Sequence, residues 1–133
     1  MPKRANGQKT KARLLSTTEK LFASHGFAGV TMRGVATMAQ TNIASVNYHF
    51  GTKEAMVLEM LKSKIGPINK KRKERLAEAK HNSCNNPLPT SEIFRALILP
   101  VGEEVQKHFS NQSNIVNIIS RSFTEPASFL EKI

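Results

Sequence analysis

The chain has 133 residues, enough for one domain or two small ones, and 39% of them are apolar, which suffices for a globular core. Lysine and arginine number 20 against 10 acidic residues, all glutamate, so the net charge is +10. The single cysteine, Cys84, excludes an internal disulfide and a cysteine-based zinc site, and it favours a reducing, cytoplasmic location. No apolar run is long enough for a secretory signal or a membrane span, so we expect no membrane association.

The positive charge is concentrated in the first part of the chain. Residues 1–80 hold 16 Lys/Arg and 5 Glu, whereas residues 81–133 hold 4 Lys/Arg and 5 Glu. A basic part joined to a near-neutral part indicates a polyanion-binding module beside a second module. A merely soluble basic protein would have the same composition, so charge alone does not decide between the two.

The first part of the chain predicts three short helices. Residues 1–9 are polar and expected to be mobile. A helix is predicted from about Thr10, with apolar residues at helical spacing, up to Gly26, a residue type that ends helices in a left-handed conformation. Thr31 is a good N-cap for a second helix, and Asn42 for a third. Helices with so little apolar length must share one small core.

Helical spacing continues through the second part. A fourth helix is predicted from Lys53, capped by Thr52, and Gly66-Pro67 is expected to kink or break it. A loop follows over residues 81–89. Further helices are predicted over residues 91–105 and 114–123 and from Pro126 onward. No strand alternation is found, so the predicted fold class is all-α.

The stretch from Thr31 to Lys53 has the pattern of two helices around a tight turn. Val46 and Phe50 share the buried face of the second of these helices, so Phe50 is expected in the core and Tyr48 at the surface. Small polar and aromatic groups can reach base edges and phosphates, and a helix that only packs would not need so many. Those of this helix are Asn42, Ser45, Asn47, Tyr48 and His49. The stretch therefore predicts a helix-turn-helix that presents one helix to the major groove of DNA.

This stretch, with its ending NYHFGTKE, resembles the DNA-binding domain of TetR-type transcriptional regulators, as do Leu21-Phe22 and Gly26-Phe27 before it. The resemblance implies a three-helix DNA-binding domain over residues 1–54, followed by a long linker helix. Residues 55–133 would then form part of an α-helical regulatory domain for effector binding and dimerisation. It also implies a homodimer of the full-length protein on a palindromic operator in double-stranded DNA. Family members normally continue into two further long helices, so we expect a fragment or a natural truncation.

The resemblance assigns DNA contacts residue by residue. The positions expected at the phosphate backbone are Thr31, Arg33, His49 and Lys53. The positions expected at base edges are Asn42, Ile43, Ala44 and Ser45, with Asn47 and Tyr48 expected at bases or phosphates. For Lys53 the physical argument agrees, because the first turn of a helix already favours a phosphate through its N–H groups and dipole.

Four residues depart from the family's pattern. Gln40 stands where the family usually has a turn glycine, and a positive φ there would cost roughly 1 kcal/mol. Gly34 replaces a frequent acidic residue and is expected to loosen the first turn of the second helix. Asn47 replaces the commoner tyrosine. Ile43 replaces a frequent lysine, so it can pack on a thymine methyl but cannot donate to guanine.

The apolar residues of the second part are expected to form a core, and by the resemblance some of them line a cavity for a small, largely apolar effector. The wall residues proposed for it are Phe94, Leu97, Ile98, Val101, Ile119 and Phe123. Arg121, like Arg95, could hold an acidic group of that ligand. Simple packing of these residues on one another explains the same composition equally well.

The predicted function is a sequence-specific DNA-binding regulator, in particular a ligand-responsive repressor. The alternative is a basic nucleic-acid-binding protein without sequence preference, which would explain the charge but not the polar row of the third helix. No catalytic pattern, metal spacing or cofactor motif is found, so an enzyme is not expected. The basic run over residues 70–75 is expected to be a solvated helix face rather than a second phosphate site.

Overall fold

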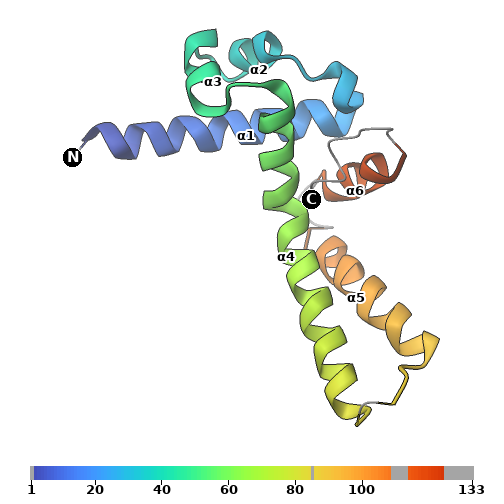
Figure 1. Ribbon diagram of the computed structural model, residues 1–133. Coiled ribbons are helices and arrows are strands. Elements are labelled where there is room, and N and C mark those ends of the chain that lie inside the picture. The colour runs from blue at the N-terminus through green and yellow to red at the C-terminus, as the bar shows by residue number, and fades with distance from the viewer. Residues whose placement is uncertain (1, 85, 109–113, 125–133) are drawn as a thin grey trace. The chain divides into compact units, whose positions relative to one another are not determined.

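A computed structural model describes residues 2–84, 86–108 and 114–124, which form helices and connecting segments without any strand (Figure 1). The helices are α1 (Pro2–Gly29), α2 (Met32–Met38), α3 (Ile43–Phe50), α4 (Lys53–Asn82), α5 (Thr90–His108) and α6 (Ile115–Thr124). The all-α prediction is confirmed. The helix predicted from Pro126 lies outside the described residues.

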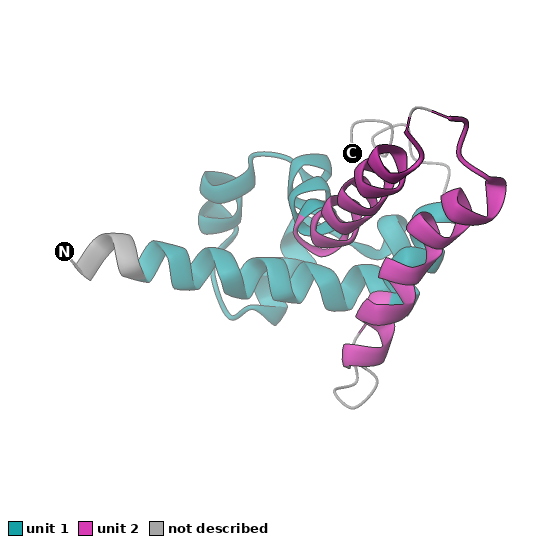
Figure 2. Cartoon of the chain, turned by 90° about the horizontal axis from the view of Figure 1, so that it is seen from below, with its two compact units in different colours: residues 1–62, 116–133 teal, residues 63–115 magenta. Residues whose placement is uncertain are grey.

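The chain divides into two compact units (Figure 2). Unit 1 comprises residues 1–62 and 116–133, and unit 2 comprises residues 63–115. The division falls inside α4, whose first turns belong to unit 1. The functional boundary after residue 54 stays a prediction.

Helix α1 begins earlier than expected and is interrupted where expected. It starts at Pro2, so the start predicted at about Thr10 is wrong, whereas the mobility predicted for residues 1–9 stays a prediction. Proline suits the first turn of a helix, because the N–H that it lacks would have no partner there. Gly26 interrupts α1 with φ 69° and ψ −170°, a left-handed conformation that glycine adopts without steric cost.

The core of unit 1 is built from one apolar face of each of its helices. Helices as short as α2 and α3 are not stable alone, and α2 packs on both α1 and α3. Phe50 is only 8% exposed, which confirms its predicted place in the core. The fully buried apolar residues are Leu14, Phe22, Val30, Val35, Val46, Met56, Val57, Met60, Leu61 and, on α6, Ile118.

In unit 2, α4 continues as one helix, so the break predicted as one outcome at Gly66-Pro67 is wrong, whereas the kink stays a prediction. Gly66 and Pro67 are both exposed. Proline removes one backbone hydrogen bond, and a helix of 30 residues keeps the others. The predicted loop correspondingly begins after Asn82.

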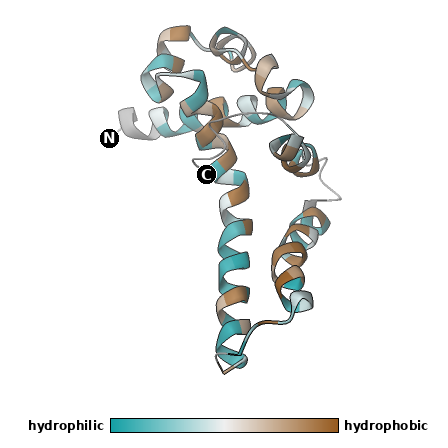
Figure 3. Ribbon diagram, turned by 45° about the vertical axis from the view of Figure 1, so that its right-hand side comes forward, coloured by the Kyte–Doolittle hydropathy of each residue, from teal (hydrophilic) through white to brown (hydrophobic). Residues whose placement is uncertain are grey.

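The basic run of α4 holds α5 rather than only facing solvent. Arg72 Nε donates to the backbone oxygen of Leu97 at 2.9 Å, and Arg75 pairs with Glu103. Lys71 Nζ lies 3.6 Å from a carboxylate oxygen of Glu103. Partly exposed ion pairs contribute only about 0–1 kcal/mol each, so their main effect is to set the register of α5 on α4. Figure 3 shows the apolar residues along α5.

Candidate nucleic-acid interface

The turn between α2 and α3 is a Schellman motif with a glutamine in the left-handed position. Gln40 has φ 51°. Its N–H donates to the Thr37 oxygen at 3.1 Å, and the Thr41 N–H donates to the Ala36 oxygen at 2.9 Å. These two bonds are the pair that closes a helix ended by a left-handed residue. The positive φ considered for Gln40 is therefore present, and α3 leaves α2 by a fixed turn.

Side-chain caps begin each of the three helices after α1. Thr31 Oγ1 accepts a hydrogen bond from the Gly34 N–H at 2.9 Å. Asn42 Oδ1 accepts one from the Ser45 N–H at 2.7 Å. At the start of α4, Thr52 Oγ1 accepts one from the Ala55 N–H at 3.1 Å. The three predicted N-caps are confirmed, and each contributes about 1 kcal/mol.

Gly34 makes room for the cap of α2. A Cβ at this position would lie 2.8 Å from Thr31 Oγ1, closer than such contacts allow. Gly34, which was expected to loosen the first turn of α2, therefore allows the Thr31 hydroxyl to approach the N–H that it caps.

Helix α3 turns one polar face away from the core. Val46 is fully buried beside Phe50, and Tyr48, on the opposite face, is 87% exposed, as predicted. Ala44 lies on the same outward face as Tyr48, with Ser45 and Asn47 on either side, as the 3.6-residue period requires. Ile43 is 40% exposed at the start of the helix. A continuous row of short side chains flanking one tyrosine is thus open to a partner.

Two further predicted residues stand at the end of this row. The His49 ring lies edge-on to the Tyr48 ring, with 5.3 Å between centroids, and is half-buried. Lys53, in the first turn of α4, has its Nζ 4.1 Å from the centroid of the Phe27 ring. The ammonium is therefore held by an aromatic face beside the positive end of a helix.

All the predicted DNA-contact residues belong to unit 1, and none of them is buried. Figure 1 shows α2 and α3 side by side, and the two helices are in contact. The half-buried members are Ser45, His49 and Lys53, and the exposed ones are Thr31, Arg33, Asn42, Ile43, Ala44, Asn47 and Tyr48.

Sequence reasoning missed the residues that brace this surface. Lys11 Nζ lies 2.6 Å from Glu59 Oε1 and 5.7 Å from the centroid of the Phe50 ring. This partly exposed lysine therefore joins α1 to α3 and α4. Phe27 under Lys53 was missed as well. No local signal could have found these pairs, because each joins residues far apart in the sequence.

The proposed effector residues fall in both units. Those of α5 belong to unit 2, where Phe94 and Ile98 are 61% and 60% exposed. Those of α6 belong to unit 1, where Phe123 is 79% exposed. The guanidinium of Arg121 donates to backbone oxygens of α1, so it is engaged within unit 1.

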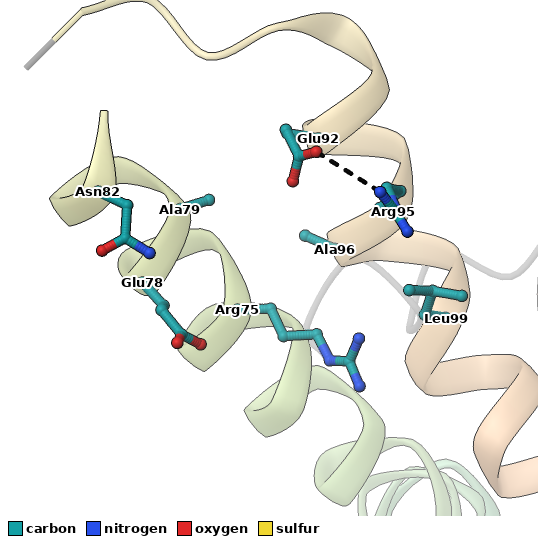
Figure 4. Close-up of a pocket in the computed structure, with 8 residues that line it drawn as sticks. All are labelled: Arg75, Glu78, Ala79, Asn82, Glu92, Arg95, Ala96 and Leu99. Atoms are coloured by element: carbon teal, nitrogen blue, oxygen red, sulfur yellow. Dashed lines mark ion pairs between the residues drawn. The ribbon is translucent and has the colours of Figure 1, made fainter.

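A groove of about 290 Å³ lies between α4 and α5 within unit 2 (Figure 4). It contains none of the proposed effector wall residues. Charged side chains from both helices line it, with an ion pair of 3.8 Å between Arg95 and Glu92. Its lining residues are Arg75, Glu78, Ala79, Asn82, Glu92, Arg95, Ala96 and Leu99.

Comparison with known proteins gives the same family for the first part of the chain. Residues 14–60 match the family model described as bacterial regulatory proteins, tetR family. The HTH-type transcriptional repressor NicS of Pseudomonas putida is 29% identical over 61 residues, which cover 46% of this chain and 29% of that protein. The chain therefore spans less than a third of the length of this curated relative.

Among solved structures, the crystal structure of a HlyIIR mutant protein carrying a substituted linker is similar, with a TM-score of 0.42 and 20% identity. The match covers 88% of this chain and 64% of that chain. By its helix-turn-helix residues and the family match, the part of the chain over residues 14–60 is similar to the DNA-binding domain of the tetR family. Among the described helices, none combines the length and apolar character needed to cross a membrane.

Proposed function

We propose that the chain is a sequence-specific DNA-binding transcriptional regulator, acting as a repressor. The observation that carries the proposal is the outward face of α3, where Ala44, Ser45, Asn47 and Tyr48 lie opposite the buried Val46 and Phe50. A helix of this size enters the major groove, where each base pair presents a distinct pattern of donors and acceptors. The curated relative is named a repressor, which supports the same direction of regulation.

Phosphate contacts from the starts of two helices, α2 and α4, would fix α3 in the groove. Thr31 and Arg33 lie at the start of α2, and both are exposed. Lys53 lies at the start of α4, and the N–H groups of a first turn have no acceptors within their own helix. Such contacts set register and orientation without reading sequence, whereas Ser45 and Asn47 reach base edges.

The proposal extends to a dimer and an effector. Two copies on a palindromic operator would place their recognition helices roughly 34–36 Å apart, one turn of DNA. A small apolar ligand that prefers another spacing would lower DNA affinity by linkage. The apolar face of α5, with Phe94, Leu97, Ile98 and Val101, is the part of unit 2 that we propose for it.

Selection of bound fragments from random duplex DNA tests the proposed function. A sequence-specific regulator enriches one palindromic consensus, whose half-site spacing gives the symmetry of the bound form. A basic nucleic-acid-binding protein without preference enriches no consensus, and that result would overturn the proposal in favour of the alternative. A thermal-shift screen of hydrophobic acids and aromatic compounds addresses the effector separately, because a ligand that binds the folded state raises the melting temperature.

A further inference from the structure

Arg121 of α6 caps the segment of α1 that ends before the left-handed Gly26. Its Nε donates to the backbone oxygen of Ala23 at 3.0 Å, and its Nη2 donates to that of Ser24 at 2.9 Å. Both oxygens belong to the last turn of α1 before the left-handed Gly26. The final carbonyls of a helix have no partner within it and carry the negative end of its dipole. A guanidinium satisfies both needs with one planar group.

The packing of α6 supports this contact. Ile118 lies three residues before Arg121, on the same side of α6, and is fully buried. The buried Ile118 and the guanidinium of Arg121 thus both attach the same face of α6 to the rest of unit 1.

The capped turn leads directly to the predicted phosphate contact. Gly26 follows the capped carbonyls after one residue, and Phe27 comes next. The ring of Phe27 makes a cation–π contact with the ammonium of Lys53. The position of this ring depends on where the segment of α1 before Gly26 ends. The contacts of Arg121 and Lys53 are therefore linked through Phe27.

We propose that Arg121 is a positioning residue for DNA binding, which caps α1 and thereby places Phe27 and, through its ring, Lys53. This inference rests on the proposed function. Arg121 itself touches no phosphate in this account. Its effect on DNA affinity is carried by Lys53.

The test is a double-mutant cycle of Arg121→Gln with Lys53→Ala, measured as affinity for the selected duplex at a temperature where every variant is folded by circular dichroism. Arg121→Gln should weaken binding about threefold to tenfold in the wild-type background and much less in the Lys53→Ala background. Lys107→Gln, the same charge change on α5, is the matched control and should leave affinity unchanged. Arg121→Lys, which keeps the charge but not the planar fork, should lie between wild type and Arg121→Gln.

The outcomes separate this inference from the proposed function. If wild type binds its selected duplex and Arg121→Gln binds it equally well, the positioning role is wrong. An equal loss in both backgrounds also overturns it, because Lys53 then does not carry the effect. If Arg121→Gln is unfolded, the same cycle with Arg121→Lys decides by the same criteria. If wild type shows no preferred duplex at all, the proposed function fails, whatever Arg121 does.

Discussion

The ammonium of Lys53 lies 4.1 Å from the centre of the Phe27 ring, so the segment that follows Gly26 holds the first basic side chain of α4. A lysine loses roughly 1.5–2 kcal/mol of rotamer entropy when it is fixed. Part of that ordering is already present here before any phosphate is bound. Pre-organisation of this kind improves affinity by lowering the entropy lost on binding.

Of the two contacts expected for Tyr48, at bases or at phosphates, we assign it the phosphate contact, as for Lys53. Lys53→Ala and Tyr48→Ala should therefore weaken binding to all duplexes about equally, because phosphate carries no sequence information. In a salt titration, the slope of log affinity should shrink by about one for Lys53→Ala and stay constant for Tyr48→Ala. Phe27→Leu is a matched variant, which keeps the charge but removes the aromatic face. It should weaken binding about twofold to fivefold without altering the slope. Unchanged affinity in both alanine variants would contradict the assignment to phosphate.

Ser45 and Asn47 should behave differently, because they flank the outward face of α3. Alanine at either position should cost roughly 1–3 kcal/mol on the preferred duplex and relax one position of its consensus. Ser120→Ala, at an exposed serine of α6, is the control and should change neither affinity nor consensus. Repeating the duplex selection with each variant makes the comparison. If both variants recover the wild-type consensus, these residues do not read bases.

Gln40→Gly should raise the free energy of unfolding by about 0.5–1 kcal/mol. Glutamine is strained at φ 51°, and glycine relieves that strain, although it also adds entropy to the unfolded chain. Ala12→Gly in the exposed middle of α1 introduces the same residue in a helical conformation and should lower stability by about 1 kcal/mol. Urea unfolding of the two variants gives both values. A loss of stability for Gln40→Gly would show that its left-handed conformation is not strained.

Thr31 and Gly34 should be energetically coupled. Gly34→Ala normally stabilises a helix by about 1 kcal/mol, but here the new Cβ would lie 2.8 Å from Thr31 Oγ1. The substitution should therefore give no gain in wild type and a gain of about 0.5–1 kcal/mol after Thr31→Ala has removed the hydroxyl. Thermal unfolding of the two single variants and the double variant measures the coupling. Simple additivity would mean that Thr31 moves aside without cost.

Local signals predicted the helix starts and the turn, whereas the contacts that brace the units were beyond sequence reasoning. Thr31, Asn42 and Thr52 cap their own helices within three residues, so their roles follow from neighbouring sequence. The outward position of Tyr48 followed equally from the helical period. The pairing of Lys11 with Glu59 depends on how separate helices pack, and no spacing in the sequence encodes it.

The basic run of α4 shows the same limit. Its composition indicated a solvated face. The contacts of Arg72 with Leu97 and of Arg75 with Glu103 of α5 join residues far apart in the sequence, so the neighbouring sequence does not predict them. The break predicted at Pro67 was wrong for a related reason. The expectation considered only the hydrogen bond that proline removes from one turn, and a helix of 30 residues tolerates the loss of one such bond.

The most direct test of the central claim, that α3 reads base sequence, compares affinity for the selected duplex and for a shuffled duplex of equal length and composition as salt is raised from 50 to about 200 mM. Both affinities fall because the release of counterions gains less free energy at higher salt, but base contacts do not depend on salt in this way. We predict that the selected duplex stays at least about a hundredfold tighter across the series, within the usual range for specific complexes. Equal affinities that fall together with the same slope would contradict the account and leave a purely electrostatic binder.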